Sequence, residues 1–383
     1  MTAAKRDIVD PAARVSVVHL AGFTLPEDGP HARAHLLAEA DRTEAYRAKY
    51  DRHTLFYDCV RLDGQDRLLF TAPRFLNLWP LFRDGLRIDG TRPRRLSRRT
   101  YPKYELVQAP APRDRVTLEI DGRETEIVPN APLAPRFAGL NAVMTMNRNN
   151  RLDWIADWLT FHVRAHGLEA ALIKDNGSDA YTLDDLARCV ASVKGLKTAV
   201  VMSAPFEYGT ELPRRASPVS PMFLQLALMN LARVETLSRA RAVLNADIDE
   251  LIAARSGARV FDAARRRWPL PVRIPGFYTY PARASGSDGR PQHEHVFRAV
   301  PDRPALRKWC IAPGGPFSRI GWFVHQIGGE LSRLVPNDRD FHLMHCSATT
   351  NDWKKKGRFN RPDALVRDDA IADMLRAYIR DDR

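Results

Sequence analysis

No apolar run in this sequence of 383 residues approaches the roughly 18 residues that a membrane-spanning helix needs. The first residues, Met-Thr-Ala-Ala-Lys-Arg-Asp, also lack the apolar core of a signal peptide. The four cysteines lie far apart and form no Cys-x-x-Cys pair, so neither a zinc site nor a disulfide framework is indicated. The sequence therefore predicts a reduced protein of the cytoplasm.

The sequence is strongly basic, with 59 lysine and arginine residues against 46 acidic residues and a formal net charge of +13. A field of this sign attracts nucleic acid, nucleotide phosphates or an anionic membrane surface. Most basic residues are scattered, and the exceptions are the runs Arg92–Arg99, Arg265–Arg267 and Lys354–Lys356. The sequence has no aromatic-interleaved RNA-binding motif and no zinc-finger spacing. We therefore expect no dedicated nucleic-acid binding, while peripheral contact with an anionic membrane stays open.

Residues 1–135 are expected to form a β-rich accessory domain. Short apolar runs alternate there with turn residues, and a polar, alanine-rich stretch at residues 31–49 is expected to be helical. The strongest hairpin pattern lies at residues 116–128, because Asp121-Gly122 is a favoured two-residue turn between two strand-like runs. The proline-rich segment 129–135 predicts a linker to the rest of the chain.

Residues 136–383 are expected to form a second, α/β domain. Apolar residues at helical spacing predict a helix from Arg151 to about His166, which Gly167 ends. The other expected elements are strands at 142–146, 170–173, 198–202 and 242–245 and helices at 182–193 and 220–236. Strands that alternate with helices imply a parallel, doubly wound sheet, which binds ligands at the carboxyl ends of its strands.

Polar residues follow three of the expected strands. Asn147, Asp175 and Asp247 each lie just past a strand end, so a parallel sheet would bring them to one crevice. For Asp175 alone, an Asx turn is an equally good interpretation, because the residue stands in a polar turn with asparagine, glycine and serine. The joint placement of Asn147, Asp175 and Asp247 at one sheet edge favours a ligand site.

The strand at 242–245 runs into two carboxylates that stand two residues apart. The pleat of a strand sends Asp247 and Asp249 to the same side, where their oxygens can hold Mg²⁺ or Mn²⁺ and leave positions for phosphate oxygens. Taken alone, this Asp-x-Asp is more typical of a solvated corner between a strand and a loop than of a metal site. The polar ends of the neighbouring strands favour the metal site.

The order of these motifs resembles the GT-A glycosyltransferases, and most closely the glycosyltransferase family 92 and family 2-like enzymes. The motifs are Met144-Thr-Met-Asn-Arg-Asn-Asn150, Trp154…Trp158-Leu-Thr-Phe-His162, Ile173-Lys-Asp-Asn-Gly-Ser178 and Leu244-Asn-Ala-Asp-Ile-Asp-Glu250. The resemblance covers residues 140–252 well and continues weakly to residue 358. Two departures are Asn149-Asn150, where the family has an Asn-Glu pair, and Leu251, where it has a phenylalanine. The resemblance implies a GT-A fold, a Rossmann-like, mostly parallel sheet.

The resemblance also implies roles for individual residues. The nucleotide-binding residues would be Thr145, Asn147, Asp175, Asp247 and Lys354. The ligands of a Mn²⁺ or Mg²⁺ cofactor would be Asp247, Asp249 and His345. The candidates for the catalytic base are Asp249, Glu250, Asp288 and Glu294.

For His345 and Lys354 the sequence also allows an interpretation without any function. Neutral imidazole suits Mn²⁺, but the run Phe341-His-Leu-Met-His345 is also typical of a strand with satisfied core histidines. Lys354 belongs to a run of three lysines that is typical of a solvated surface. The neighbouring Trp353 instead favours a flap whose cation meets a diphosphate.

These features predict a metal-dependent glycosyltransferase that moves a sugar from a nucleotide-sugar, expected to be a UDP-sugar, to a glycan or glycolipid in surface polysaccharide assembly. The resemblance implies inversion at the anomeric carbon. A sugar nucleotidyltransferase would share the sheet and the carboxylates, but the sequence lacks a glycine-rich loop with a basic tail after the first strand. A non-catalytic glycan- or nucleic-acid-binding protein and an inactive glycosyltransferase also stay open.

Overall fold

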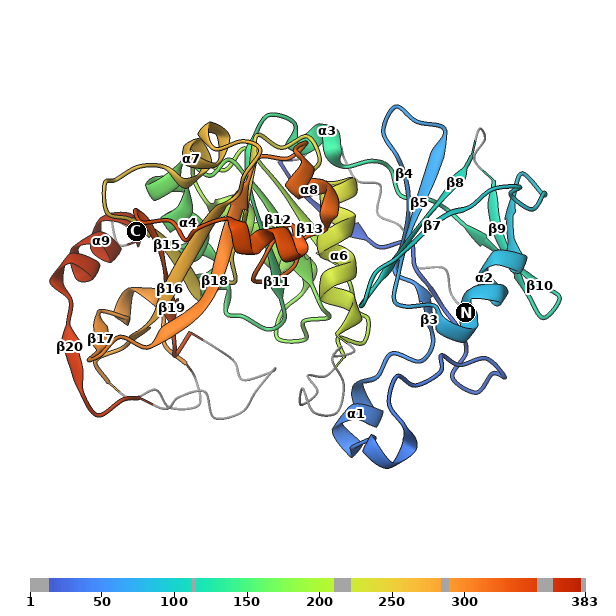
Figure 1. Ribbon diagram of the computed structural model, residues 1–383, viewed down its shortest axis with the longest axis horizontal. Helices are drawn as coiled ribbons and strands as arrows, with labels where there is room; N and C mark the ends of the chain where they lie inside the picture. The colour runs from blue at the N-terminus through green and yellow to red at the C-terminus, as the bar shows by residue number, and fades with distance from the viewer. Residues whose placement is uncertain (1–13, 112–114, 210–221, 284–288, 350–360, 380–383) are drawn as a thin grey trace. The chain divides into compact units, whose positions relative to one another are not determined.

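The computed structural model describes residues 14–111, 115–209, 222–283, 289–349 and 361–379 (Figure 1). These residues form two compact units, each assembled from separate stretches of the chain. The first unit takes the described residues up to Val18, those from Arg136 to Ser203 and those from Leu237 onward. The second unit takes His19–Pro135 and the described part of Ala204–Thr236. The sequence pattern does not predict this return of the chain to the second unit after residue 203.

The first unit is built on a mixed sheet of eleven strands whose central part is parallel. Strands β13, β12, β11 and β14 are neighbours in that order and all run in the same direction. Beyond β14 the sheet continues through the antiparallel strands β18 and β16. The α/β class and the parallel strands are confirmed, and the antiparallel extension makes the sheet mixed. The strands are β1 Val15–His19, β11 Asn141–Asn147, β12 Ala170–Asp175, β13 Thr198–Ser203, β14 Ala242–Asn245, β15 Glu250–Ala254, β16 Val272–Tyr280, β17 Phe297–Ala299, β18 Pro304–Ile311, β19 Phe341–Cys346 and β20 Leu365–Arg367.

Local sequence explains how the helices of this unit begin and end. Helix α4 (Leu152–His166) ends where Gly167 adopts the left-handed conformation, with φ of 68°. Helix α5 (Leu183–Ser192) begins with a capping box, in which Thr182 and Asp185 satisfy each other's backbone amides. The remaining helices are α3 Ala134–Phe137, α7 Val260–Arg266, η3 Gln292–Glu294, α8 Pro316–Ile320, η4 Gly329–Leu334 and α9 Asp369–Ile379.

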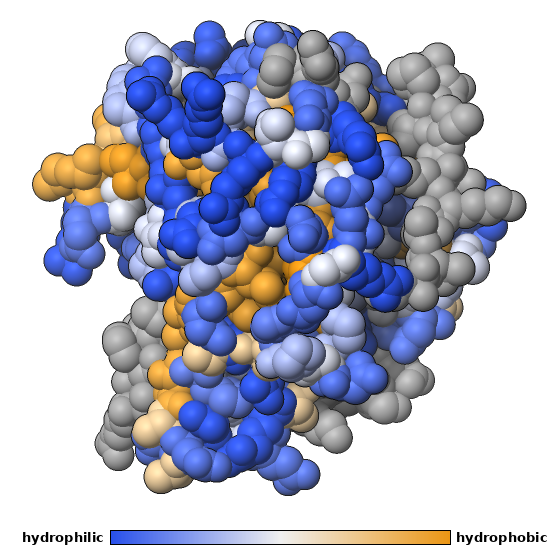
Figure 2. All heavy atoms as spheres, turned by 90° about the vertical axis from the view of Figure 1, so that its right-hand side faces the viewer, coloured by the Kyte–Doolittle hydropathy of each residue, from blue (hydrophilic) through white to orange (hydrophobic). Residues whose placement is uncertain are grey.

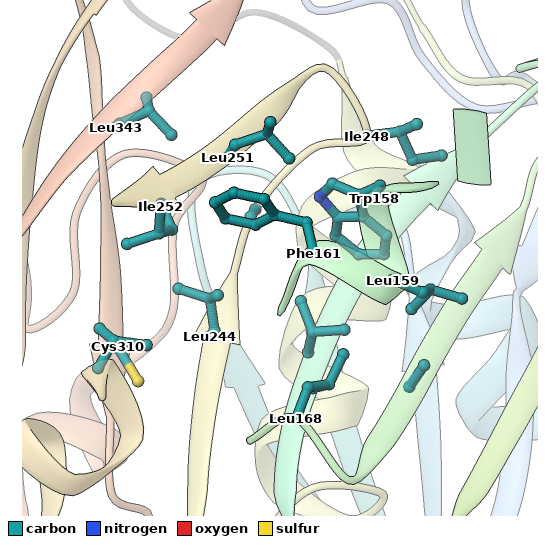
Figure 3. Close-up of a cluster of buried hydrophobic side chains, with 14 of the residues drawn as sticks. Trp158, Leu159, Phe161, Leu168, Leu244, Ile248, Leu251, Ile252, Cys310 and Leu343 are labelled. Atoms are coloured by element: carbon teal, nitrogen blue, oxygen red, sulfur yellow. The ribbon is translucent and has the colours of Figure 1, made fainter. Parts of the chain in front are cut away.

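One hydrophobic core joins helix α4 to the centre of the sheet. Trp158 and Leu159 of α4 belong to the same buried cluster as Leu244 of β14, and Figure 3 shows these side chains with Ile248 and Leu251. Helix α4 also contacts α5 and α9, while α7 contacts β14 and β18. The core therefore fixes the strand end at which the sequence places its two carboxylates.

The second unit contains three antiparallel sheets, in the orders β4-β5-β8-β7, β10-β9-β6 and β2-β3. Its core is aromatic, since Phe70 lies 5.3 Å from Phe56 and 5.2 Å from Phe82 between ring centroids. The hairpin expected at residues 116–128 is present, with Asp121 and Gly122 both at positive φ. Its elements are β2 Phe23–Thr24, η1 Glu39–Asp41, α1 Glu44–Lys49, β3 Thr54–Phe56, β4 Asp58–Arg61, β5 Arg67–Ala72, η2 Leu76–Leu78, α2 Trp79–Gly85, β6 Leu86–Ile88, β7 Ser97–Thr100, β8 Glu105–Pro110, β9 Val116–Ile120, β10 Arg123–Ile127 and α6 Phe223–Val234.

The helix expected at residues 31–49 is wrong over most of its length, because α1 covers only its last six residues. The side chain of Arg33 is buried and donates hydrogen bonds to the carbonyl oxygens of Asp51 and Thr54. A buried guanidinium requires such partners, and these long-range bonds hold the segment out of a helix. Tertiary contacts here outweigh the local helix propensity.

Within the described residues, no helix is long and apolar enough to cross a membrane. The side of the molecule drawn in Figure 2 is largely hydrophilic, and hydrophobic residues show in patches between the polar side chains.

Candidate active site

The chain turns at the carboxyl end of β14, and the turn carries three carboxylates. Residues 246–250, which we call the acidic loop, read Ala-Asp-Ile-Asp-Glu and lead into β15. Ile248 is buried in the core with Trp158 (Figure 3), whose indole N–H donates to the Glu250 carbonyl oxygen at 3.0 Å. The side chains of Asp247 and Asp249 remain 28% and 16% exposed. The alternation of apolar and acidic residues thus turns these two carboxylates away from the core.

Strand β19 places His345 beside the acidic loop. Glu250 and His345 are direct partners in the antiparallel pair β15–β19, and the Cys346 amide donates to the Asp249 carbonyl oxygen at 2.8 Å. The His345 Nε2 atom lies 3.2 Å from a carboxylate oxygen of Asp249, and Nδ1 lies 3.6 Å from one of Glu250. The structure therefore brings the three expected metal ligands, Asp247, Asp249 and His345, to one end of the sheet.

A buried lysine underlies the acidic loop, and no sequence motif predicts it. Lys308 stands on β18, the antiparallel neighbour of β14, and its side chain is fully buried. Its Nζ atom lies 2.7 Å from Asp247 Oδ2 and 3.0 Å from Glu250 Oε2. The same Glu250 oxygen accepts a hydrogen bond from the Asp247 amide at 2.8 Å. The sequence offers one signal for this residue: Lys308 directly precedes the apolar run Trp309–Ala312, which indicates a charged side chain on a buried strand.

The charges of this group are strongly coupled. Burial would lower the pKa of the Lys308 ammonium, but the carboxylates of Asp247 and Glu250 raise it above its usual value. Burial raises the pKa of the Glu250 carboxyl, and the Lys308 ammonium opposes that rise. Lys308 is therefore the cation that makes the burial of Glu250 tolerable.

The residues present fit a divalent cation. Ligand oxygens of Asp247, Asp249 and Glu250 all lie within 4.8 Å of one another. Two ligands that share a cation through bonds of about 2.1 Å at right angles stand about 3 Å apart, close to the 3.2 Å between Asp249 and His345. Three carboxylates thus gather beside one buried lysine and one histidine. The carboxylate oxygens suit Mn²⁺ or Mg²⁺, and an imidazole ligand beside them favours Mn²⁺ over Mg²⁺.

A second polar group, which we call the Asp175 cluster, lies at the ends of β11 and β12. It consists of Asn147, Asp175, Ser178 and Tyr181. Asp175 accepts hydrogen bonds from the Asn147 side-chain amide at 2.7 Å, the Ser178 hydroxyl at 2.6 Å and the Ser178 backbone amide at 2.9 Å. The Asn147 amide also donates to Tyr181 at 2.8 Å. Asp175 thus holds the turn that follows β12, as the Asx-turn interpretation expects, and fixes Asn147.

Register places the acidic loop and the Asp175 cluster at the same edge of the sheet. Asn147 is the partner of Asp175 in the parallel pair β11–β12, and Met144 is the partner of Asn245 in the pair β11–β14. Both groups therefore follow parallel strands that end side by side. Thr145 lies just before this edge, and its buried hydroxyl has no hydrogen-bond partner among the described residues. Buried side-chain polar atoms without a partner are uncommon in native proteins.

The short helix η3 is attached to the acidic loop. The side-chain amide of Gln292 donates to the carbonyl oxygens of Trp154 and Ile248, both at 3.0 Å. Two residues further on, Glu294 is partly exposed, and its carboxylate lies 3.8 Å from Arg290. His295 is buried, which lowers its pKa to about 3, and its neutral ring accepts a hydrogen bond from the Ala348 amide. Neither Gln292 nor His295 follows from a sequence motif.

Two predicted site residues lie outside the described residues. These are Lys354, expected to meet the diphosphate, and Asp288, one candidate for the catalytic base. Of the other base candidates, Glu250 is only 2% exposed and is engaged by Lys308, whereas Glu294 is accessible.

No protein-family model matches this chain, and no curated protein does. Among solved structures, part of the chain is similar to the mannosyltransferase Ktr4p from S. cerevisiae. The similar part covers 39% of this chain and 40% of that protein, with 12% sequence identity and a TM-score of 0.25. The chain thus spans less than half of the length of that mannosyltransferase, and the likeness is too slight to assign an activity.

Proposed function

We propose that this protein is a metal-dependent GT-A glycosyltransferase that uses a nucleotide-sugar donor. The observation that carries the proposal is the acidic loop with His345, which lies at the same sheet edge as the Asp175 cluster. Ligands of α/β sheets bind at the carboxyl ends of parallel strands. A cation site at the same edge as the Thr145 hydroxyl suits a nucleoside diphosphate. The motifs that resemble the family 92 and family 2-like enzymes lie on these same residues.

In this proposal Asp247, Asp249 and His345 hold Mn²⁺ or Mg²⁺. The ion, when bound, would neutralise negative charge that develops on the departing diphosphate. Lys308 neutralises Glu250 and one oxygen of Asp247, and so fixes the acidic loop in the orientation that presents Asp249. In this arrangement Glu250 holds the acidic loop in place through its ion pair with Lys308 and is not the catalytic base.

The nucleotide would lie against β11 and β12. The Thr145 hydroxyl and the Asn147 side chain are the proposed contacts of the base and ribose, and Asp175 holds Asn147 in place through the 2.7 Å hydrogen bond. A preorganised amide loses little freedom on binding, which favours affinity.

The acceptor needs a base, and we assign this role to Glu294. Its carboxylate is partly exposed, and its helix is bonded to the acidic loop through Gln292. The carboxylate would take the proton of the acceptor hydroxyl while that oxygen bonds to the anomeric carbon and the bond to the diphosphate breaks. Attack from the face opposite the diphosphate gives inversion. We also propose that Lys354 binds the diphosphate as a further cation.

For the donor and acceptor we propose a UDP-sugar and a glycan or glycolipid of surface polysaccharide assembly, as the motif resemblance implies. The deciding experiment is calorimetric titration with UDP, with and without Mn²⁺, on the native chain and on Asp249→Asn. The proposal expects that Mn²⁺ strengthens UDP binding to the native chain but not to the variant. UDP binding that is indifferent to Mn²⁺, or no UDP binding, contradicts it. Turnover of UTP with a sugar 1-phosphate would instead identify a nucleotidyltransferase.

A further inference from the structure

Five large hydrophobic side chains of the first unit are exposed and belong to three segments that meet at the surface. They are Trp268, Leu270, Ile320, Leu331 and Leu334, and Leu334 is 77% exposed. They make up more than half of the large hydrophobic residues that are exposed among the described residues. We call this group the Leu334 surface. Scattered single hydrophobics need no explanation, but such a concentration marks an interaction site.

The three segments are in contact. A Cβ atom built on Gly315, at the start of α8, would lie 2.9 Å from Pro269 and 3.2 Å from the Trp268 indole nitrogen. One built on Gly329, at the start of η4, would lie 3.6 Å from the Ile320 side chain. Arg273, just after the first segment, donates to the carbonyl oxygens of Ser332 and Val335 at 2.9 and 2.6 Å. The five side chains therefore belong to one continuous surface.

Arginines flank the three apolar segments in the sequence. Exposed arginines stand beside each segment, namely Arg265, Arg266, Arg267, Arg319, Arg333 and Arg339. The carboxylates beside them are those of Glu330, which pairs with Arg333, Asp338, which pairs with Arg267, and Asp340, which follows Arg339. Six arginines against three carboxylates give a local positive charge that agrees in sign with the whole chain.

We propose that the Leu334 surface binds peripherally to an anionic lipid bilayer. Leucine and isoleucine side chains would enter the boundary between headgroups and acyl chains. The amphipathic indole of Trp268 would lie at the same level, where tryptophan is enriched in membrane proteins. The arginines would contact lipid phosphates and attract the positively charged chain to the anionic surface. The inference does not rest on glycosyl transfer, since adsorption requires no turnover.

A second group of exposed hydrophobic residues differs from the Leu334 surface in the charge around it. Val300, Leu306 and Val366 are also exposed, at 60%, 64% and 58%. Arg298 pairs with Asp302 and Asp368, and Arg367 pairs with Asp369, while Arg303 and Arg307 also stand beside these residues. Four arginines against three carboxylates leave one positive charge here, compared with three at the Leu334 surface. An anionic bilayer would therefore be attracted more strongly to the Leu334 surface than to this group, although both are apolar.

Vesicle sedimentation tests the inference with the full chain. The native protein should bind vesicles of phosphatidylglycerol and phosphatidylcholine in equal amounts, bind pure phosphatidylcholine weakly, and be released by salt. The double variant Leu331→Ser, Leu334→Ser should lower the partition constant by about tenfold or more, because the inserted side chains are lost. Arg265→Glu with Arg266→Glu should lower it by about tenfold or more through charge.

Matched controls separate a local surface from a general effect of composition. Leu306→Ser changes a leucine whose exposure lies between those of Leu331 and Leu334, and Arg94→Glu with Arg95→Glu makes the same charge change in the second unit. Both controls should bind anionic vesicles nearly as the native chain does, and thermal melts should show all variants folded. If the native chain does not bind these vesicles, or if the controls lose as much binding as the test variants, the inference is overturned. Sedimentation velocity that shows self-association abolished by Leu331→Ser, Leu334→Ser, with no vesicle binding, would assign the surface to a second copy instead.

Discussion

The Asp175 cluster and the acidic loop lie at the same edge of the sheet, but they satisfy their carboxylates in opposite ways. Asp175 is surrounded by uncharged donors, namely an amide side chain, a hydroxyl and a backbone N–H. The acidic loop gathers three carboxylates and has one buried ammonium, Lys308, beneath it. The first group holds one carboxylate with uncharged donors, whereas the second holds three carboxylates close together in an arrangement that could hold a metal ion.

This difference suits the two groups to different functions. A closed network of hydrogen bonds holds a shape, so the Asp175 cluster is suited to position a nucleotide. A partly exposed group of carboxylates costs free energy through mutual repulsion unless a cation binds, so the acidic loop is suited to hold a metal. Substitutions in the two groups should therefore have different consequences.

The largest effect is expected from Asp249→Ala. Loss of a direct metal ligand should reduce transfer and donor hydrolysis to below about 1% of the native rate. The melting temperature should stay close to the native value, because the side chain is partly exposed at a strand end. Activity assays beside thermal melts check this, with the exposed Asp369→Ala as control. Near-native metal-dependent rates in Asp249→Ala would remove the assignment.

Lys308→Met is expected to change stability most. Without the ammonium, the buried carboxylate of Glu250 would lose its cation, and breaking a buried pair costs about 3–5 kcal/mol of unfolding free energy. Urea unfolding measures this loss. The double variant Lys308→Met, Glu250→Gln should recover part of it, because the uncompensated carboxylate is removed as well. A single variant as stable as the native chain would show that Lys308 does not support the loop.

Asp175→Ala should have a smaller effect, and a different one. It removes the acceptor that fixes Asn147, so UDP binding should weaken by about 1–3 kcal/mol, the usual result of leaving a buried donor unsatisfied. Mn²⁺ binding without nucleotide should barely change. Calorimetry with each ligand separates the two effects. Unchanged UDP affinity would leave Asp175 with a purely structural role in its turn.

A separate test concerns Asp58 of the second unit, a buried carboxyl that accepts hydrogen bonds from the backbone amide of Ala21 and the side-chain amide of Asn130. Burial raises its pKa to about 7. The folded chain thus retains a proton that the unfolded chain loses near pH 4, so this stabilisation is complete below about pH 4 and is lost as the pH rises through about 7. The unfolding free energy should fall by up to about 1.4 kcal/mol per pH unit in this window.

Asp58→Asn keeps the neutral shape and the acceptor oxygen, so it should flatten this pH dependence. Urea unfolding of both proteins at several pH values between about 4 and 7 checks the prediction. Parallel pH profiles for the native chain and the variant would contradict it.

The parallel core of the fold could be predicted from sequence because its signals are local. Strands β11, β12, β13 and β14 read as short buried runs, and α4 has apolar residues at helical spacing before Gly167. The antiparallel extension through β18 and β16 could not be predicted, because it depends on pairing between residues far apart in the chain. The return of α6 to the second unit has the same cause.

The same contrast holds within the candidate site. Asp247 and Asp249 stand together in the sequence, and their position after a strand was visible. Lys308 reaches Asp247 from 61 residues away through the pairing of β14 with β18, and Gln292 reaches Ile248 from 44 residues away. Side chains that support a site from distant strands carry no local motif, so only the folded chain reveals them.

The most direct test of the central claim is a Mn²⁺ titration followed by electron paramagnetic resonance, without nucleotide, on the native chain, Asp249→Asn and Asp175→Asn. These two variants remove one charge each from the two groups at the same sheet edge. The account predicts that the native chain and Asp175→Asn bind Mn²⁺ alike, and that Asp249→Asn binds it at least about tenfold more weakly. Equal Mn²⁺ binding by Asp249→Asn and the native chain would contradict the account.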